Sequence, residues 1–188
     1  VETLAGVKTI QVFTENGLVS RARVNMGKPG LMRSEIPMIG NETQVIDEIL
    51  TISKEVSFRI TCVSMGNPHG IVFADDLGSV DISKYGPEIE CHQAFPERIN
   101  IHFVQIHSSN EVTMKTWERG SGITMACGTG ASAVCVAGVL NKKTGRKVLA
   151  HLPGGDLELE WAEDNNVYMA GPATEVFHGE WTFPQKGC

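Results

Sequence analysis

The sequence lacks the features of membrane proteins and of proteins that bind polyanions. Its most apolar stretch, Ala131 to Leu140, is far shorter than the ~20 residues that a membrane span needs, and no signal-peptide pattern opens it. Lys and Arg number 16 against 22 Asp and Glu, which gives a formal net charge of −6, and no block of like charge stands out. We therefore expect neither a membrane surface nor a nucleic acid as partner.

Motifs for metals and common cofactors are also missing. The six histidines are scattered along the chain, and neither Cys-x-x-Cys nor His-Glu-x-x-His occurs. There is no Walker loop, Gly128-Thr129-Gly130 is too short for a dinucleotide fingerprint, and nothing marks a pyridoxal site. We expect no metal and no cofactor.

The five cysteines, at positions 62, 91, 127, 135 and 188, show no pairing pattern. An odd number of unpaired cysteines is typical of a reducing compartment, so we expect a cytoplasmic protein. The 188 residues are enough to bury a real core. The sequence starts at Val1 without an initiator Met, and we expect it to be part of a longer polypeptide.

Most of the chain has the residue pattern of β-strands. Glu15-Asn16-Gly17 predicts a tight hairpin, and Gly66 to Gly70 predicts a loop between two strands. The strands are expected over residues 7–14, 18–25, 56–65, 71–73, 99–106, 112–117, 147–152, 157–161, 167–170 and 174–183.

Two helices are expected among these strands. The first lies within residues 81–93 and is interrupted at Gly86-Pro87. The second runs from about Gly128 to Leu140 and is apolar on every side, which indicates a buried helix with small side chains. We therefore predict an α+β fold, with a mixed or antiparallel sheet wrapped around a central apolar helix.

Cys127 is the strongest candidate for a functional residue. It lies between Ala126 and the Gly128-Thr129-Gly130 turn that opens the second predicted helix. A thiol at the positive end of a helix is expected to form thiolate more readily, and the free N–H groups there suit a carboxylate. Cys135 and Cys62 are expected in the core.

Other polar segments carry weak signals when each is taken alone. Asn67-Pro68-His69 is compatible with a simple turn, and Glu118-Arg119 with a solvated strand end. Asn100 has no signal of its own.

Taken in order, several segments closely resemble those of the diaminopimelate epimerase family. They are Met65-Gly66-Asn67-Pro68-His69, Pro96-Glu97-Arg98-Ile99-Asn100, Trp117-Glu118-Arg119-Gly120-Ser121-Gly122, Ala126-Cys127-Gly128-Thr129-Gly130, Leu152-Pro153-Gly154-Gly155-Asp156 and Gly171-Pro172-Ala173. The resemblance implies a two-lobed isomerase that needs no cofactor. It also implies a role in bacterial lysine and cell-wall synthesis, in which the enzyme interconverts LL- and meso-diaminopimelate. Two cysteines on opposite faces of the α-carbon would act there as base and acid.

The resemblance also implies a role for each matching residue. Cys127 would be the second catalytic cysteine, with His69 and Glu118 tuning the thiols. The backbone of Gly128 and Thr129 would hold the reacting carboxylate. Substrate would further be bound by Asn67, Asn100, Glu118 and Arg119, the last suited to a bidentate grip on the distal carboxylate.

The family's first cysteine, in a Cys-Gly-Asn-Gly motif, has no counterpart in this sequence. We therefore expect residues 26–174 to form the C-terminal lobe, and residues 1–25 and 175–188 to belong to a mostly missing N-terminal lobe. This chain alone would then be inactive. The resemblance further suggests a homodimer with Phe177 near its interface.

Two alternatives remain open. One is a proline or hydroxyproline racemase, which shares the cysteine turn. The other is a non-catalytic module that binds amino acids.

Overall fold

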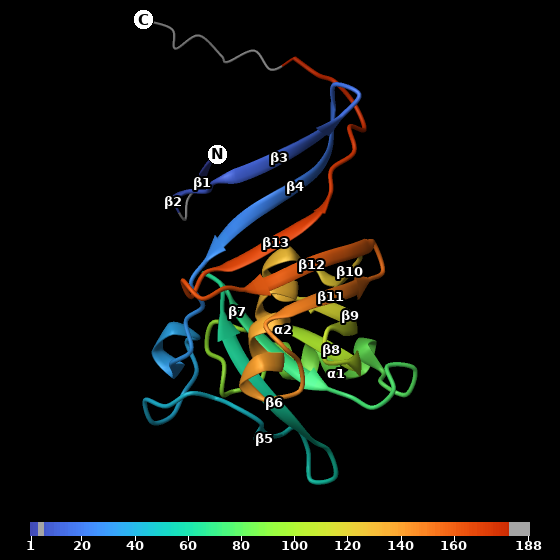
Figure 1. Ribbon diagram of the computed structural model, residues 1–188. Coiled ribbons are helices and arrows are strands. Elements are labelled where there is room, and N and C mark those ends of the chain that lie inside the picture. Colours follow the sequence, from blue (N-terminus) through green and yellow to red (C-terminus); the bar gives the residue numbers. More distant parts are fainter. Residues whose placement is uncertain (4–5, 181–188) are drawn as a thin grey trace, which may run out of the picture.

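The structure is a computed structural model that describes residues 1–3 and 6–180. Within these ranges eleven strands form one sheet, in the order β3-β4-β13-β12-β11-β9-β8-β7-β6-β5, with β10 paired to β9 at the side (Figure 1). They are β3 (Ile10–Glu15), β4 (Leu18–Gly27), β5 (Glu48–Thr51), β6 (Ser57–Ser64), β7 (Pro68–Phe73), β8 (Asn100–Ser108), β9 (Glu111–Glu118), β10 (Gly122–Thr124), β11 (Lys147–Leu152), β12 (Gly155–Trp161) and β13 (Val167–Pro172). The short strands β1 (Glu2–Thr3) and β2 (Gly6–Val7) pair with each other, and a 3-10 turn, η1, spans Arg33–Glu35.

The predicted hairpin at the start of the chain is confirmed. β3 and β4 pair as antiparallel strands, and Asn16 (φ 51°) and Gly17 (φ 81°) both take the left-handed conformation between them. A two-residue turn with two positive φ angles matches the twist of a hairpin, and Asn-Gly adopts it at low cost.

Two parallel strand pairs set the position of the helices. β7 and β8 are parallel and joined through α1 (Ile82–Glu90), while β9 and β11 are parallel and joined through β10 and α2 (Gly128–Leu140). A parallel pair needs such a long crossover. The β7–β8 register sets His69 beside Asn100, and the β8–β9 register sets His102 opposite Thr116.

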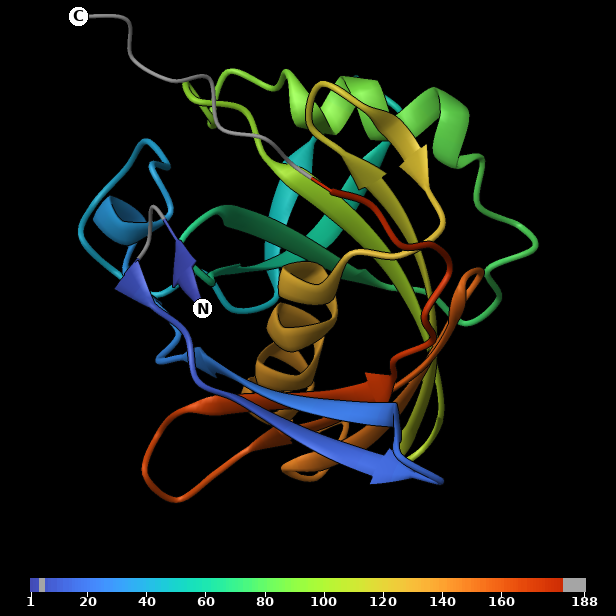
Figure 2. The same cartoon turned by 90° about the horizontal axis from the view of Figure 1, so that it is seen from above.

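Helix α2 has the bounds predicted from the sequence and is buried along most of its length. Residues 130–138 are all buried, and the helix packs against β6, β7, β8, β11, β12 and β13. Figure 2 shows it on the inner side of the curved sheet. Its small side chains let strands approach from several directions, and this packing forms the larger of the two apolar cores.

Helix α1 corrects the prediction of a break at Gly86-Pro87. It begins at the cap Asp81, whose Oδ1 accepts from the Lys84 N–H at 3.1 Å, and it continues through Pro87. The proline removes one helical hydrogen bond. Tertiary packing offsets this loss. Ile89 is buried in the second core, and the backbone of Gly86 packs closely against Trp117, since an added Cβ would lie 2.6 Å from the indole.

Two further expectations need correction, and two strands were missed. The loop predicted from Gly66 to Gly70 is shorter, because Pro68 and His69 already lie in β7, paired with β6. The strand predicted over residues 174–183 does not form over 174–180, which have no regular secondary structure. Residues 181–183 lie outside the described residues. Strands β5 and β10 were not predicted, since both are short and depend on pairing with a neighbour.

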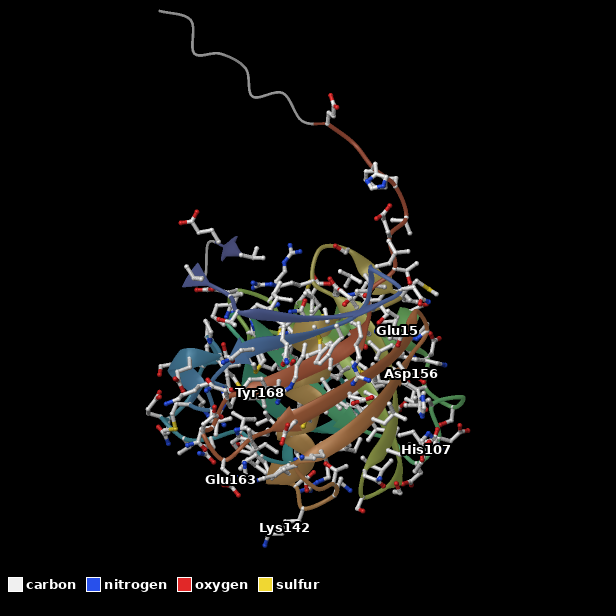
Figure 3. The ribbon with its side chains drawn as sticks, turned by 45° about the horizontal axis from the view of Figure 1, so that its top comes forward. Glu15, His107, Lys142, Asp156, Glu163 and Tyr168 are labelled. Atoms are coloured by element: carbon white, nitrogen blue, oxygen red, sulfur yellow. The ribbon has the colours of Figure 1, made fainter. Side chains whose placement is uncertain are left out.

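Charged side chains project from the outer face of β4 and β12, where Arg21 pairs with Glu158 and Arg23 with Glu160. Figure 3 shows Lys142 and Glu163 at the lower edge of the molecule and His107 at its side. Neither helix within the described ranges has the length and apolar character of a membrane-spanning segment.

Candidate active site at the amino terminus of α2

Cys127 lies at the position that caps the N-terminus of α2. Its backbone is extended (φ −142°, ψ 101°), and its carbonyl accepts the first helical bond, from the Ala131 N–H at 2.9 Å. The first N–H groups of a helix have no partner within the helix, and they carry partial positive charge. Gly128 and Thr129 are only half-buried there, so this helix end can receive a carboxylate.

The expectation of a lowered pKa for the Cys127 thiol is wrong for this structure. Burial raises the pKa, since the side chain is only 8% exposed and a thiolate would lose its hydration. The Thr129 hydroxyl, 3.7 Å from Sγ, and the Gly130 amide lower the pKa, and the carboxylate of Glu118 raises it. Desolvation is the largest of these effects, so the thiol form is favoured at neutral pH.

We predict that iodoacetamide at pH 7 alkylates Cys91 before Cys127 in the folded chain. Cys91 is exposed, whereas Cys127 is buried with a raised pKa, and only thiolate reacts. Peptide mapping of timed samples measures both rates. The same mapping in guanidinium should give similar rates for both, and faster reaction of Cys127 in the folded chain would contradict the prediction.

Two buried histidines stand beside the thiol. His69 on β7 and His102 on β8 are both fully buried, and His69 Nδ1 lies 2.9 Å from His102 Nε2. Ligand atoms of His69, His102 and Cys127 all lie within 4.8 Å of one another, a grouping that the scattered spacing of the histidines in the sequence did not predict. The ring nitrogens also contact Asn67 and Thr116, so hydrogen bonds link the two rings to their neighbours.

His102 was missed by the sequence reasoning. One signal could have found it: in a strand, alternate residues share a face, and Asn100 and His102 are two positions apart in β8. Asn100 was predicted to lie in the site. His102 lies on the same face of β8 and could therefore have been predicted to point toward the site as well.

The buried histidines predict a loss of stability in mild acid. Burial lowers the pKa of His102 to about 3 and that of His69 well below 6.5. Below about pH 6.5 the unfolded chain therefore binds protons that the folded chain does not, and stability falls as pH drops from about 6.5 toward 3. For His102 alone the loss is about 2 kcal/mol at pH 5.

Urea unfolding at pH 7 and pH 5 measures this loss, with His102→Gln as the matched variant that lacks the titrating ring. His151 acts in the opposite direction: Asp156 and Glu111 raise its pKa, so its stabilisation is complete below about pH 6.5 and fades as pH rises through its folded pKa. Both the wild type and the His102→Gln variant contain His151, so its contribution cancels when their pH dependences are compared. Equal pH dependence in wild type and variant would contradict the assignment to His102.

Asn100 links two segments of the site. Its Nδ2 donates to the Pro68 carbonyl at 2.8 Å, and its Oδ1 accepts from the Arg119 N–H at 3.0 Å. The side chain is 4% exposed, and its contact with a substrate stays a prediction. In this structure it holds the start of β7 to the turn after β9.

The Glu118-Arg119 turn is fixed from several sides. Glu118 accepts from the Thr124 hydroxyl at 2.8 Å, and Arg119 Nη1 donates to the Glu97 carbonyl at 2.8 Å. Buried Glu90 accepts from the Gly120 N–H at 3.0 Å. Asn67, on the other side, lies 3.4 Å from the Thr129 hydroxyl. The structure therefore places the residues predicted for the site around the N-terminus of α2.

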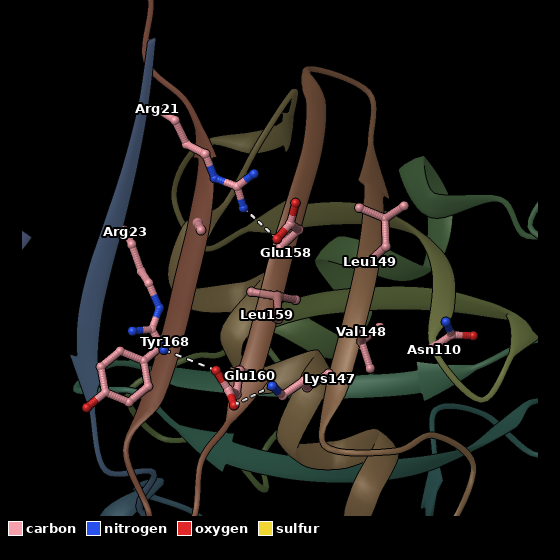
Figure 4. A pocket seen from close by; sticks show the side chains of 11 residues that line it. Arg21, Arg23, Asn110, Lys147, Val148, Leu149, Glu158, Leu159, Glu160 and Tyr168 are labelled. Carbon is pink, nitrogen blue, oxygen red and sulfur yellow. Dashed lines mark hydrogen bonds and ion pairs between the residues drawn. The ribbon is translucent and has the colours of Figure 1, made fainter. Parts of the chain in front are cut away.

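A cavity of about 340 Å³ lies elsewhere, on the outer face of β4, β13, β12 and β11 (Figure 4). Its cations are already paired: Arg21 with Glu158, and Arg23 and Lys147 with Glu160. Because its charges are neutralised in this way, it offers less to an anionic amino acid than the α2 terminus does.

The mixed sheet with its two helices is a fold that solved racemases and epimerases also have. A hydroxyproline epimerase from Agrobacterium vitis matches with a TM-score of 0.63 at 14% identity, over 91% of this chain and 55% of that one. A probable proline racemase from Agrobacterium radiobacter K84 matches with a TM-score of 0.64 at 13% identity, over 91% and 56%. At this identity the likeness concerns the fold alone.

The family follows from closer matches. The model of the family "Diaminopimelate epimerase" matches residues 61–176, and the chain belongs to that family. Diaminopimelate epimerases from Pelotomaculum thermopropionicum and Moorella thermoacetica are 54% and 48% identical to it, covering 97% and 96% of this chain. One from Methanococcus maripaludis is 48% identical. The chain spans 65% of the length of each of these relatives.

Proposed function

We propose that this chain supplies one of the two catalytic thiols of a cofactor-independent isomerase that interconverts LL- and meso-diaminopimelate. The observation that carries the proposal is the placement of Cys127 at the α2 terminus, with Thr129 3.7 Å from its sulfur and Glu118 close enough to raise its pKa. The named relatives support the choice of substrate.

In the proposed reaction the substrate's α-carboxylate binds at the N–H groups of Gly128 and Thr129. Negative charge grows on that carboxylate as the α-proton leaves, and preorganised N–H donors stabilise the charge where it develops. The Cys127 thiol, protonated at neutral pH, delivers a proton to one face of the α-carbon. A second thiol, outside this chain, removes the proton from the opposite face, and the roles reverse in the other direction.

The other residues bind and orient the substrate. Arg119 offers a fork for the distal carboxylate, while Asn67, Asn100 and Glu118 contact the distal amino-acid end. His69 and Glu118 set the protonation of the thiols. We expect no metal and no pyridoxal to take part.

We further propose that residues 26–174 form the C-terminal lobe, with its sheet wrapped around α2. Residues 1–25 and 175–188 would belong to a second lobe that covers the site. Exposed apolar side chains on the β3–β4 hairpin support this, among them Val12 (55% exposed) and Leu18 (67%), together with Phe177 (81%) near the C-terminus. Apolar side chains gathered in this way are typical of a surface that other protein covers. The whole enzyme would act in lysine biosynthesis in the cytoplasm, as a homodimer with Phe177 near the interface.

The test uses the full-length protein in D₂O with diaminopimelate and without added pyridoxal or metal. We expect exchange of the α-hydrogen with solvent and interconversion of the two isomers. Strict dependence on either cofactor would refute the proposal.

A proline racemase-type activity is a second candidate, favoured by the fold shared with the two Agrobacterium proteins. Turnover of proline but not of diaminopimelate would support it. Binding of diaminopimelate without any isotope exchange would instead support a non-catalytic binding module.

A further inference from the structure

We propose that His102 and Thr116 are positioning residues for the thiol of Cys127. Together they fix the proton distribution along a hydrogen-bond chain that begins in the core and ends at the half-buried Thr129, whose hydroxyl then donates to the sulfur. The inference rests on the proposed function only in taking Cys127 as the reacting thiol.

The chain of contacts is continuous from β9 to α2. Thr116 Oγ1 lies 3.0 Å from His102 Nδ1, and His102 Nε2 lies 2.9 Å from His69 Nδ1. His69 Nε2 lies 2.9 Å from Asn67 Oδ1. Asn67 Nδ2 lies 3.4 Å from Thr129 Oγ1, which in turn lies 3.7 Å from the sulfur of Cys127.

The donor and the acceptor of each hydrogen bond in this series can be assigned by starting from Asn67. Asn67 Oδ1 can only accept, so His69 Nε2 carries a proton, and His69 Nδ1 of the neutral ring is then an acceptor. His102 must therefore donate from Nε2, which leaves its Nδ1 to accept from the Thr116 hydroxyl. The other side of the Asn67 amide donates to Thr129, and the Thr129 proton is free to point at the sulfur.

Neutral rings are what this arrangement requires. Both histidines are fully buried, and burial lowers the pKa of each. The charged groups that act on the cluster are Arg119, which lowers the pKa of His69 further, and Glu118, which raises that of Cys127. In a dry cluster an unpaired ring nitrogen would be costly, so the loss of one link is expected to disturb the others.

Packing holds the His102 ring in place. A side chain at Gly130 would run into it, since an added Cβ would lie 2.6 Å from His102 Nε2 and 3.0 Å from the Cys127 sulfur. The ring therefore lies directly against the first turn of α2, and glycine is the residue that admits it there.

The experiment measures how the alkylation rate of Cys127 depends on pH, on this chain, by iodoacetamide labelling and peptide mapping. His102→Phe keeps an aromatic ring but removes the Nε2 donor. We expect the midpoint of its Cys127 profile to rise by about one pH unit, that is, about tenfold less thiolate at a given pH. His102→Gln restores an N–H donor in place of Nε2, so the midpoint of its Cys127 profile should lie close to that of the wild type.

Thr116→Val and Thr61→Val form a matched pair. Both remove a buried hydroxyl from a strand, and Thr61 Oγ1 has two partners of its own, the Asp47 N–H at 2.9 Å and Asn141 Nδ2 at 2.8 Å. Thr116→Val should raise the midpoint, while Thr61→Val should lower only the melting temperature.

A lowered melting temperature with an unchanged midpoint in both His102→Phe and Thr116→Val would overturn the proposal, because a purely structural role predicts that result. If His102→Phe does not fold, Thr116→Val decides. The alkylation profile of Cys127 is measured without substrate. If the full-length protein did not exchange the α-hydrogen of diaminopimelate with solvent, the proposed function would be refuted, but this inference would still be decided by the alkylation profiles.

Discussion

The 188-residue chain on its own is expected to show no measurable inversion of diaminopimelate. Inversion needs a base on one face of the α-carbon and an acid on the other, and in the described residues only Cys127 is a thiol at the mouth of α2. Without the second lobe that we propose, water would also reach the helix end and weaken its hold on the developing charge. Loss of optical rotation or chiral chromatography measures the turnover.

Weak binding should survive in this chain, because the α2 terminus and the Arg119 turn are formed. Calorimetry with diaminopimelate measures that binding, and addition of the segment with the first cysteine should restore activity. Racemisation by the chain alone at a rate comparable to the full-length enzyme would show that another group, such as His69, supplies the second proton.

Cys127→Ala in the full-length protein should reduce isomer interconversion by about 10³-fold, since general acid–base groups contribute about 10²–10⁴-fold. Chiral analysis under saturating diaminopimelate measures the rate.

Cys135→Ala is the matched control. Cys135 is fully buried in the middle of α2, with its Sγ 3.7 Å from the Arg146 carbonyl, so its loss should cost stability of about 1 kcal/mol and leave the rate constant nearly unchanged. Equal activity of the Cys127→Ala enzyme and wild type would remove Cys127 from the mechanism.

Much of the fold could be predicted because local signals and tertiary packing agree. Asn16-Gly17 forms its hairpin, and α2 runs from Gly128 to Leu140 as its small apolar residues indicated. The segments around Asn67, Asn100, Arg119 and Cys127 also converge, which the order of the motifs predicted through family resemblance.

Other features depend on contacts that the sequence does not show. Pro87 stays within α1 because Gly86 and Ile89 pack on the sheet. The raised pKa of Cys127 results from burial by distant segments. His102 and Thr116 meet only through the register of β8 and β9, and their hydrogen bonds leave no pattern along the chain.

The most direct test of two thiols on opposite faces is the distribution of deuterium early in the reaction of the full-length protein in D₂O. A two-base mechanism predicts deuterium at the α-carbon of the product, delivered by the thiol on the face opposite to the base that removed the proton, while recovered substrate still carries protium. The measurement is mass spectrometry of each isomer after separation, at a few per cent conversion. Equal labelling of substrate and product, or product that retains the original hydrogen, would contradict the account, because one base acting on both faces would then carry the proton.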